Sequence, residues 1–170
     1  PVNKTGYKTD LKKLTSKYKI ESALICSVLP KLAKIIAGEL KDTSTAGRIY
    51  IIGKDIIVPI KNLYRKPCTA GQDRLINAYA AASIYGVPAV AIDFGTAITF
   101  DVVSRRKEYL GGMILAGIGA SLEALAQKTA LLPVLRLKKP KEFIGRSTKE
   151  GMLSGAIYGL LLAFGILYPD

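Results

Sequence analysis

The stretch DFGTAITFD at residues 93–101 carries the most information about the fold. A short apolar run ends in Asp93, and a β-branched segment follows Gly95-Thr96, which predicts a strand, a tight turn and a second strand. Glycine in such a turn lets backbone N–H groups approach a phosphate, and the Thr96 hydroxyl can donate to phosphate oxygens. Asp93 at the strand end can hold a cation that offsets phosphate charge. A plain hairpin turn would explain the glycine but not a carboxylate at each end of the motif.

The segments on either side alternate between predicted strands and helices. Strands are predicted at 22–28, 88–92, 97–103 and 109–115, and helices near 10–18, 30–40, 75–85 and 120–131. Residues 48–52 and 55–60 are predicted to pair as two strands about a turn at Gly53-Lys54. This succession favours an α/β or α+β protein with a mixed sheet, divided into two lobes by a seam near residues 86–88.

The composition excludes several classes of function. The 170 residues contain 25 Lys and Arg, 13 Asp and Glu, and no His, which gives a net charge of +12. Without histidine there is no Ser-His-Asp relay and no His-ligated zinc site. Residues 1–70 hold 14 basic and 5 acidic side chains, a balance of +9. Such a segment can bind nucleic acid, but its lysines lack the interleaved aromatic residues that stack bases, which favours a solvated face that steers anions.

Two further features bear on compartment and membrane association. Cys26 lies in an apolar run and is expected to be a buried free thiol. Its distance from Cys68 in the sequence matches no metal-binding spacing. With only these two cysteines, a reducing cytoplasm is favoured. Residues 151–169 carry no charge, and Gly151, Gly155 and Gly159 have the spacing of closely packed helices. A buried core or interface helix is favoured over membrane insertion.

Residues 71–74, GQDR, open the predicted helix at 75–85. An aspartate at a helix start is often only a cap. Asp73 can also take the proton of a substrate hydroxyl, and Arg74 can bind an anionic substrate. We expect the adjacent arginine to keep Asp73 ionised.

Two weaker motifs follow in the second half of the chain. Glycines 111, 112 and 117 surround an apolar strand and permit close approach by a flat ligand such as adenosine, although glycines beside strands also mark bulges. The segment IGRST at 144–148 precedes the last helix, where Ser147 or Thr148 can act as an N-cap.

In this order the four motifs resemble the type III pantothenate kinase family of the acetate/sugar-kinase and actin superfamily. The matching stretches are GQDRLINAYAA (71–81), DFGTAITFDVV (93–103), YLGGMILAGIGASLEALAQKTALLP (109–133) and IGRSTKEGMLSGAIYG (144–159). The resemblance implies an α/β fold of two ribonuclease H-like lobes. Residues 1–87 would be the remainder of the N-terminal lobe with the substrate loop, and 88–170 the C-terminal lobe. It also implies that the first strands and the C-terminal end are lacking, because the family's Asp-x-Gly-Asn-Thr loop does not occur in this sequence.

The resemblance further implies ATP-dependent phosphorylation of pantothenate, the first step of coenzyme A biosynthesis, with Asp73 as the proton acceptor. It implies pantothenate contacts at Tyr64, Gly71, Gln72, Asp73, Arg74 and Thr148. It implies ATP contacts at Gly95, Thr96, Gly111 and Gly112, and a monovalent cation, K⁺ or NH₄⁺, at Asp93. Mg²⁺, a homodimer and a cytoplasmic location are also implied, with no membrane or nucleic-acid partner.

Two alternatives remain from other classes. A non-catalytic accessory or transcription-regulatory protein would bind DNA through the basic N-terminal third. A membrane-associated protein would use residues 151–169.

Two residues depart from the family pattern. Ala116 stands where the family usually has Pro, and Ser147 stands where it often has Asn, so these two loops are expected to differ locally.

Overall fold

The computed structural model describes residues 20–42 and 47–163, together with positions 9, 11, 13, 14, 17 and 18. Of the helix predicted near 10–18, positions 11, 13, 14 and 17 are helical, and positions 10, 12, 15 and 16 lie outside the described residues. Two compact units are present. The first is built from the described residues up to Ala91 and from Asp101–Gly111, and the second from Ile92–Phe100 and the described residues from Gly112 onward.

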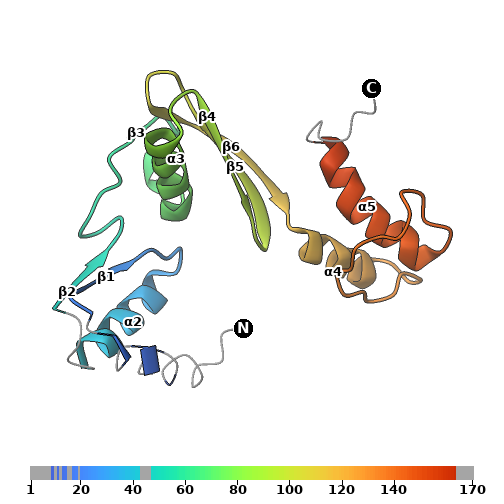
Figure 1. Ribbon diagram of the computed structural model, residues 1–170, viewed down its shortest axis with the longest axis horizontal. Helices are drawn as coiled ribbons and strands as arrows, with labels where there is room; N and C mark the ends of the chain where they lie inside the picture. Colours follow the sequence, from blue (N-terminus) through green and yellow to red (C-terminus); the bar gives the residue numbers. More distant parts are fainter. Residues whose placement is uncertain are drawn as a thin grey trace. The chain divides into compact units, whose positions relative to one another are not determined.

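The N-terminal part of the first unit is a β–α–β arrangement. Strands β1 (Ser22–Ile25) and β2 (Arg48–Ile51) pair in parallel, with Ser22 opposite Arg48. Helix α2 (Pro30–Asp42) begins at a proline, which suits the first helical turn, and lies along this strand pair in Figure 1. Its apolar stripe contributes Ala33 and Leu40 to a small core that also contains Ile25.

The predicted strand at 55–60 is wrong. Residues 53–55 form a turn, and a single bridge joins Ile52 to Ile56. The Asp55 carboxylate accepts a hydrogen bond of 2.8 Å from the Ile51 N–H, which closes the turn. The following chain contains Pro59, which has no N–H to donate to a strand partner. The partner of β2 is instead β1, which lies far from it in the sequence.

A four-stranded sheet has the order β3-β6-β5-β4. Its strands are β3 (Lys61–Asn62), β4 (Ala89–Phe94), β5 (Ala97–Val103) and β6 (Glu108–Ala116). Strand β3 is parallel to β6, with Lys61 opposite Glu108. A two-residue connection between the neighbours β4 and β5 requires them to be antiparallel. The strands predicted at 88–92, 97–103 and 109–115 are confirmed.

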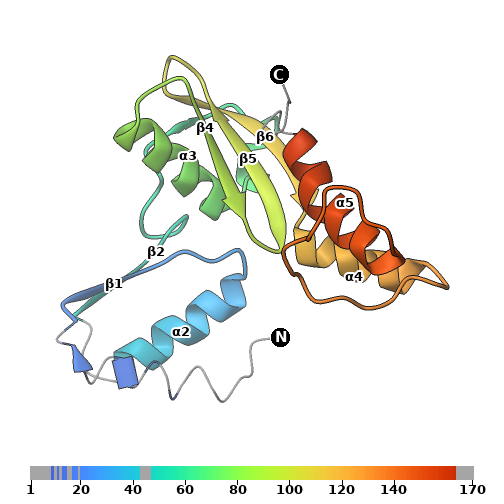
Figure 2. The ribbon, with the colours of Figure 1, turned by 45° about the vertical axis from the view of Figure 1, so that its right-hand side comes forward.

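Helix α3 (Gln72–Ile84) provides the main core of the first unit. It follows a short 3₁₀ turn at Pro67–Thr69. Its inward face places Leu75, Ala78 and Ala82 in one cluster with Val103 of β5 and Tyr109 of β6. Small alanines allow the helix to approach the strands closely, and Figure 2 shows α3 beside them. The prediction of a buried helix at 75–85 is confirmed, with its start three residues earlier.

The second unit contains helices α4 (Ile118–Lys128) and α5 (Thr148–Ala163), which contact each other. Figure 2 shows them side by side. Leu125 and Lys128 of α4, together with Gly155 and Gly159 of α5, help to line a groove of about 630 Å³. Among the described residues, no helix has both the length and the apolar character that a membrane crossing requires.

Candidate active site

The Asp73 carboxylate is fixed at the first turn of α3. Gly71 is the N-cap residue, and Asp73 Oδ1 accepts a hydrogen bond of 2.9 Å from the Arg74 N–H. The same oxygen lies where a Cβ on Gly71 would stand. A negative charge is also favoured at a helix N-terminus. Asp73 is exposed, so its carboxylate is both held in place and accessible to a substrate.

The Arg74 side chain points away from solvent and pairs with Asp101. Its Nε donates a hydrogen bond of 2.7 Å to Asp101 Oδ1, and the Tyr109 hydroxyl donates to the same oxygen at 3.0 Å. Asp101 is fully buried and Arg74 is 7% exposed. The arginine therefore supports Asp73 through its backbone N–H, while its guanidinium has a different carboxylate as its partner.

Burial and the Asp101 carboxylate together shift the pKa values of Arg74 and Tyr109. Burial alone would lower the pKa of Arg74, but the Asp101 charge and hydrogen bonds with Asp101 and Tyr64 outweigh it, so the pKa lies above its usual value. Burial raises the pKa of Tyr109, and its hydrogen bond to the Asp101 carboxylate raises it further. Arg74 therefore stays charged and Tyr109 stays protonated, which are the states that their hydrogen bonds need.

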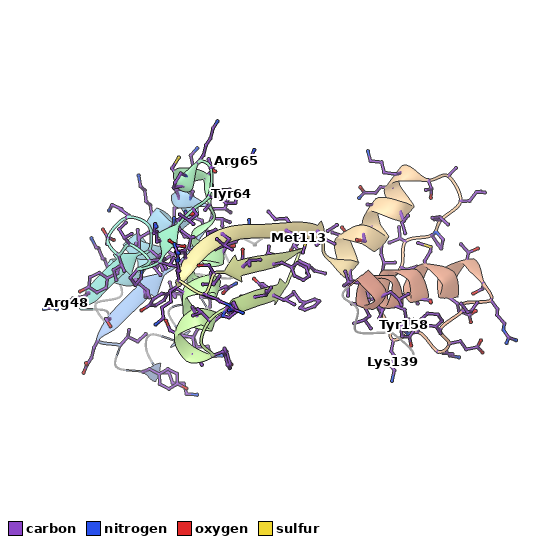
Figure 3. All side chains as sticks on the ribbon, turned by 90° about the horizontal axis from the view of Figure 1, so that it is seen from above. Arg48, Tyr64, Arg65, Met113, Lys139 and Tyr158 are labelled. Carbon is purple, nitrogen blue, oxygen red and sulfur yellow. The ribbon has the colours of Figure 1, made fainter. Side chains whose placement is uncertain are left out.

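Tyr64 adds an aromatic wall to the cluster. Its ring stacks on that of Tyr109 with 6.1 Å between centroids, and Figure 3 labels it in the loop that follows β3. The ring lies against Gly111, where a Cβ would be 3.3 Å away. Gly111 has a φ of 111°, a conformation that suits glycine. The structure thus brings Tyr64 and Arg74, which the resemblance assigns to pantothenate, together with Gly111, which it assigns to ATP.

Gln72 contacts the turn after β2. Its side chain lies 2.7 Å from the point where a Cβ on Gly53 would be, and Gly53 has a φ of 81°. Residues 71–74 are thereby packed against the β–α–β part of the same unit. Sequence reasoning did not connect these two segments.

Asp101 and Tyr109 are the residues that sequence reasoning missed. Asp101 was noted only as the second carboxylate of the 93–101 stretch. The signal available was its position inside a β-branched strand, where a carboxylate is either on a solvated face or buried with a partner. The identity of that partner, Arg74, depends on long-range packing and was not visible.

The Gly95-Thr96 turn belongs to the second unit and packs on the start of α4. Gly117 donates a backbone hydrogen bond of 2.8 Å to the Thr96 carbonyl oxygen. A Cβ on Gly117 would overlap the carbonyl oxygens of Gly95 and Thr96. Thr96 is exposed. The turn predicted from the sequence is confirmed, and Gly117 is the residue that permits its packing.

Asp93 has the chemistry of a ligand for a hard cation. It lies near the end of β4, is exposed and stands two residues before the turn. Carboxylate and carbonyl oxygens suit such ions. In the part of the chain that the structure describes, no group of three His, Cys, Asp or Glu could form a complete metal cage.

Thr148 begins α5, and the N-cap role falls to Ser147. Ser147 Oγ accepts a hydrogen bond of 3.3 Å from the Glu150 N–H, and Glu150 Oε2 accepts one of 3.0 Å from the Arg146 N–H. This reciprocal arrangement is close to a capping box. Thr148 is exposed and is not needed for the cap, so its hydroxyl can serve a ligand.

The prediction of a buried Cys26 is wrong. Cys26 and Cys68 are both free and exposed. Strand β1 ends at Ile25, so Cys26 falls in the loop that follows the core residue. Partial burial raises the pKa of the Cys26 thiol, and the charge of Asp73 raises it further. The loop after β1 therefore lies within electrostatic reach of the start of α3.

The structure is that of a mixed α/β protein. Comparison with known sequences is more specific, because the family model for type III pantothenate kinase matches residues 2–166. The chain belongs to the type III pantothenate kinase family.

Individual relatives agree with this assignment. The chain is 41% identical over 145 residues to a type III pantothenate kinase of Persephonella marina, covering 85% of this chain and 56% of that protein. It is 39% identical over 142 residues to the one of a Sulfurihydrogenibium species, covering 84% and 56%. With that of Koribacter versatilis it shares 50% identity over 105 residues, covering 61% and 38%. The chain thus spans about half the length of the curated relatives it matches.

A solved structure has the same fold. It is a Campylobacter jejuni protein assigned to the Baf family of transcriptional activators, with a TM-score of 0.53 and 19% identity. The match covers 94% of this chain and 70% of that chain. At this identity the likeness concerns the fold alone.

Proposed function

We propose that the protein phosphorylates pantothenate with ATP, forming phosphopantothenate in the first step of coenzyme A biosynthesis. One observation carries the proposal. Within a chain of the pantothenate kinase family, the exposed Asp73 carboxylate is fixed at a helix start by Gly71 and the Arg74 N–H. A carboxylate held in this way suits a general base.

Phosphoryl transfer needs positioning, charge neutralisation and one base. Asp73 takes the proton of the pantothenate hydroxyl as that oxygen attacks the γ-phosphorus of ATP, and the bond from this phosphorus to the β–γ bridging oxygen breaks, so that ADP leaves. The acceptor is bound by Tyr64, Gly71, Gln72, Arg74 and Thr148. ATP supplies the phosphoryl group and is bound by Gly95, Thr96, Gly111 and Gly112. None of these roles requires the histidine that the chain lacks.

Asp93 would hold a monovalent cation, K⁺ or NH₄⁺, beside the phosphates. Its exposed carboxylate near the Gly95-Thr96 turn supports this role. Mg²⁺ would be bound mainly through the nucleotide phosphates, as is usual for an ion that keeps few protein ligands. Both ions would offset the negative charge of ATP.

The remaining proposals concern the whole protein. Two ribonuclease H-like lobes (residues 1–87 and 88–170) and a homodimer formed with the help of α5 both rest on the family resemblance. A cytoplasmic location agrees with two free cysteines. Sedimentation of the full-length protein at micromolar concentration tests the dimer, and a monomer would contradict it.

The full-length protein provides the test of the activity. With ATP, Mg²⁺ and K⁺ present, we expect ADP to form only when pantothenate is added, together with a product heavier than pantothenate by one phosphoryl group. Replacing K⁺ by Na⁺ should lower the rate if Asp93 holds the cation. ADP formation independent of pantothenate would refute the proposed substrate.

The DNA-binding alternative is not favoured. Its supporting feature is the basic N-terminal third, whose described Lys and Arg side chains are all exposed, but the family model for type III pantothenate kinase matches residues 2–166. Binding of DNA whose affinity falls steeply with rising salt concentration would support this alternative.

A further inference from the structure

Three hydrogen bonds connect the buried pair Asp101 and Tyr109 to Asp73, the residue proposed as the base. Tyr109 donates its hydroxyl to Asp101, and Asp101 accepts Nε of Arg74 at 2.7 Å. The backbone N–H of the same arginine donates to the Asp73 carboxylate at 2.9 Å. The side chain of Arg74 is therefore anchored on the sheet, while its main chain holds the group proposed to take the proton.

Burial gives this connection its rigidity. Asp101 and Tyr109 are both fully buried, and Arg74 is 7% exposed. A charge in such a place that lost its partner would be strongly unfavourable, so pairing with Asp101 favours the orientation in which the guanidinium is held. The guanidinium carbon Cζ of Arg74 also lies 5.9 Å from the centroid of the Tyr109 ring, so this ring limits movement of the arginine in addition to Asp101.

The anchor joins elements that are distant in the sequence. Arg74 lies in the first turn of α3, whereas Asp101 is on β5 and Tyr109 on β6. Besides this anchor, the start of α3 is held by its own backbone, by the packing of Leu75 and by the contact of Gln72 with Gly53. A displacement of about 1 Å at a reacting group can cost about a hundredfold in rate.

We propose that Asp101, assisted by Tyr109, is a positioning residue that fixes the Asp73 carboxylate through Arg74. This inference rests on the proposed function, because it assigns a catalytic purpose to the buried pair. Neither residue touches the substrate in this account. Their effect is on where Asp73 stands, and hence on turnover more than on nucleotide binding.

The test uses three variants of the full-length protein. Asp101→Asn removes the charge with little change in shape, and Tyr109→Phe removes only the hydroxyl. Glu108→Gln is the matched control, because it neutralises the neighbouring carboxylate on β6, which pairs with exposed Lys61 instead. For each variant, kcat and the KM values for pantothenate and ATP are measured per folded molecule, with folding followed by circular dichroism.

We expect Asp101→Asn to lower kcat by about 10- to 100-fold and Tyr109→Phe by about 3- to 10-fold. The KM for ATP should stay within about twofold, and Glu108→Gln should keep the kcat of the parent protein. A pair that only stabilised the fold would lower the melting temperature and leave kcat per folded molecule unchanged, and that result would overturn the proposal. If Asp101→Asn does not fold, Tyr109→Phe decides by the same criterion.

Hydrogen–deuterium exchange separates this proposal from the proposed function. Peptides covering residues 71–78 should exchange faster in Tyr109→Phe and in folded Asp101→Asn than in the parent protein, whichever acceptor the enzyme uses. A parent protein inactive on pantothenate would refute the substrate assignment. Unchanged exchange at 71–78 in both variants would refute the anchor.

Discussion

Gly71 has no room for a side chain, because the Asp73 carboxylate oxygen lies where a Cβ would be. We predict that Gly71→Ala moves this carboxylate and lowers kcat by about 10- to 100-fold. Stability should change by less than about 1 kcal/mol, since the φ of −61° is open to alanine and the obstructing atom ends a side chain. Steady-state kinetics and urea unfolding measure the two effects.

Gly38 in α2 is the control for this substitution. A Cβ there would meet nothing within 4 Å. Gly38→Ala should therefore keep the parent kcat and stabilise the protein by about 0.5–1 kcal/mol, the usual gain inside a helix. If Gly71→Ala showed the same behaviour, the close approach of Asp73 to Gly71 would have no catalytic importance.

At the residue scale, the sequence predicted the surroundings of some side chains correctly and of others incorrectly. It selected Asp73 from its place at a helix start, and the local geometry there is set by neighbours in the chain. It expected Arg74 to act on Asp73 by charge, whereas the guanidinium pairs with Asp101, 27 positions later. It also predicted that Cys26 is buried, because an apolar run does not show at which residue the strand will end.

At the level of elements, the pairing of β3 with β6 includes an ion pair. Lys61 Nζ donates to Glu108 Oε1 at 2.6 Å. This hydrogen bond and the lysine charge lower the pKa of Glu108 below its ordinary value, against a smaller opposing effect of burial. A carboxyl group with a lowered folded-state pKa stabilises the protein above its unfolded pKa, and this contribution is lost as pH falls through the folded value.

We therefore predict that the stability difference between the parent protein and Glu108→Gln is largest near neutral pH. It should shrink as pH falls below the ordinary glutamate range. Urea unfolding at a series of pH values measures it, and Lys61→Met should give the same profile by removing the donor. A difference that stayed constant down to the most acidic conditions would show that the ion pair does not stabilise the strand pairing.

The turn between β4 and β5 depends on its packing against the start of α4. The atoms that a Cβ on Gly117 would meet are backbone carbonyl oxygens, which cannot rotate away. We predict that Gly117→Ala costs about 1–3 kcal/mol of stability, as overpacking usually does. The KM for ATP should rise several-fold because the Gly95-Thr96 turn shifts.

Gly119→Ala, two residues further along α4, provides the comparison. A Cβ at Gly119 would meet nothing within 4 Å, so the variant should be as stable as the parent or more so, with an unchanged KM for ATP. Thermal unfolding and kinetics at varied ATP distinguish the two variants. Equal behaviour would mean that the packing of Gly117 does not hold the turn.

Among the elements, local patterns predicted α2, α3 and the strands β4 to β6 well. The failure at 55–60 has a physical cause. Short β-rich segments on either side of a Gly-Lys pair favour a hairpin, but the Asp55 side chain closes the turn and β1 provides a parallel partner for β2. Parallel pairing through a helix is a long-range choice that the hairpin signal does not reveal.

For the whole molecule, the uneven charge and the motifs indicate different things. The +12 charge lies largely in residues 1–70, where every described Lys and Arg is exposed, so it bears on encounter with anions. The motifs bear on chemistry, and they predicted the family correctly because each depends on a short stretch of chain. Short stretches of sequence could not predict the packing that orients Asp73, because this packing involves the three separate elements α3, β5 and β6.

In the proposed reaction, Asp73 is the base in the phosphorylation of pantothenate. The most direct measurement compares kcat of the full-length protein with that of Asp73→Asn, using Glu123→Gln on α4 as a control for loss of an exposed carboxylate. Removal of a general base should lower kcat by about 10²- to 10⁴-fold while the variant still folds. The control should keep the parent rate. An Asp73→Asn variant that phosphorylates pantothenate at the full parent rate would contradict the account.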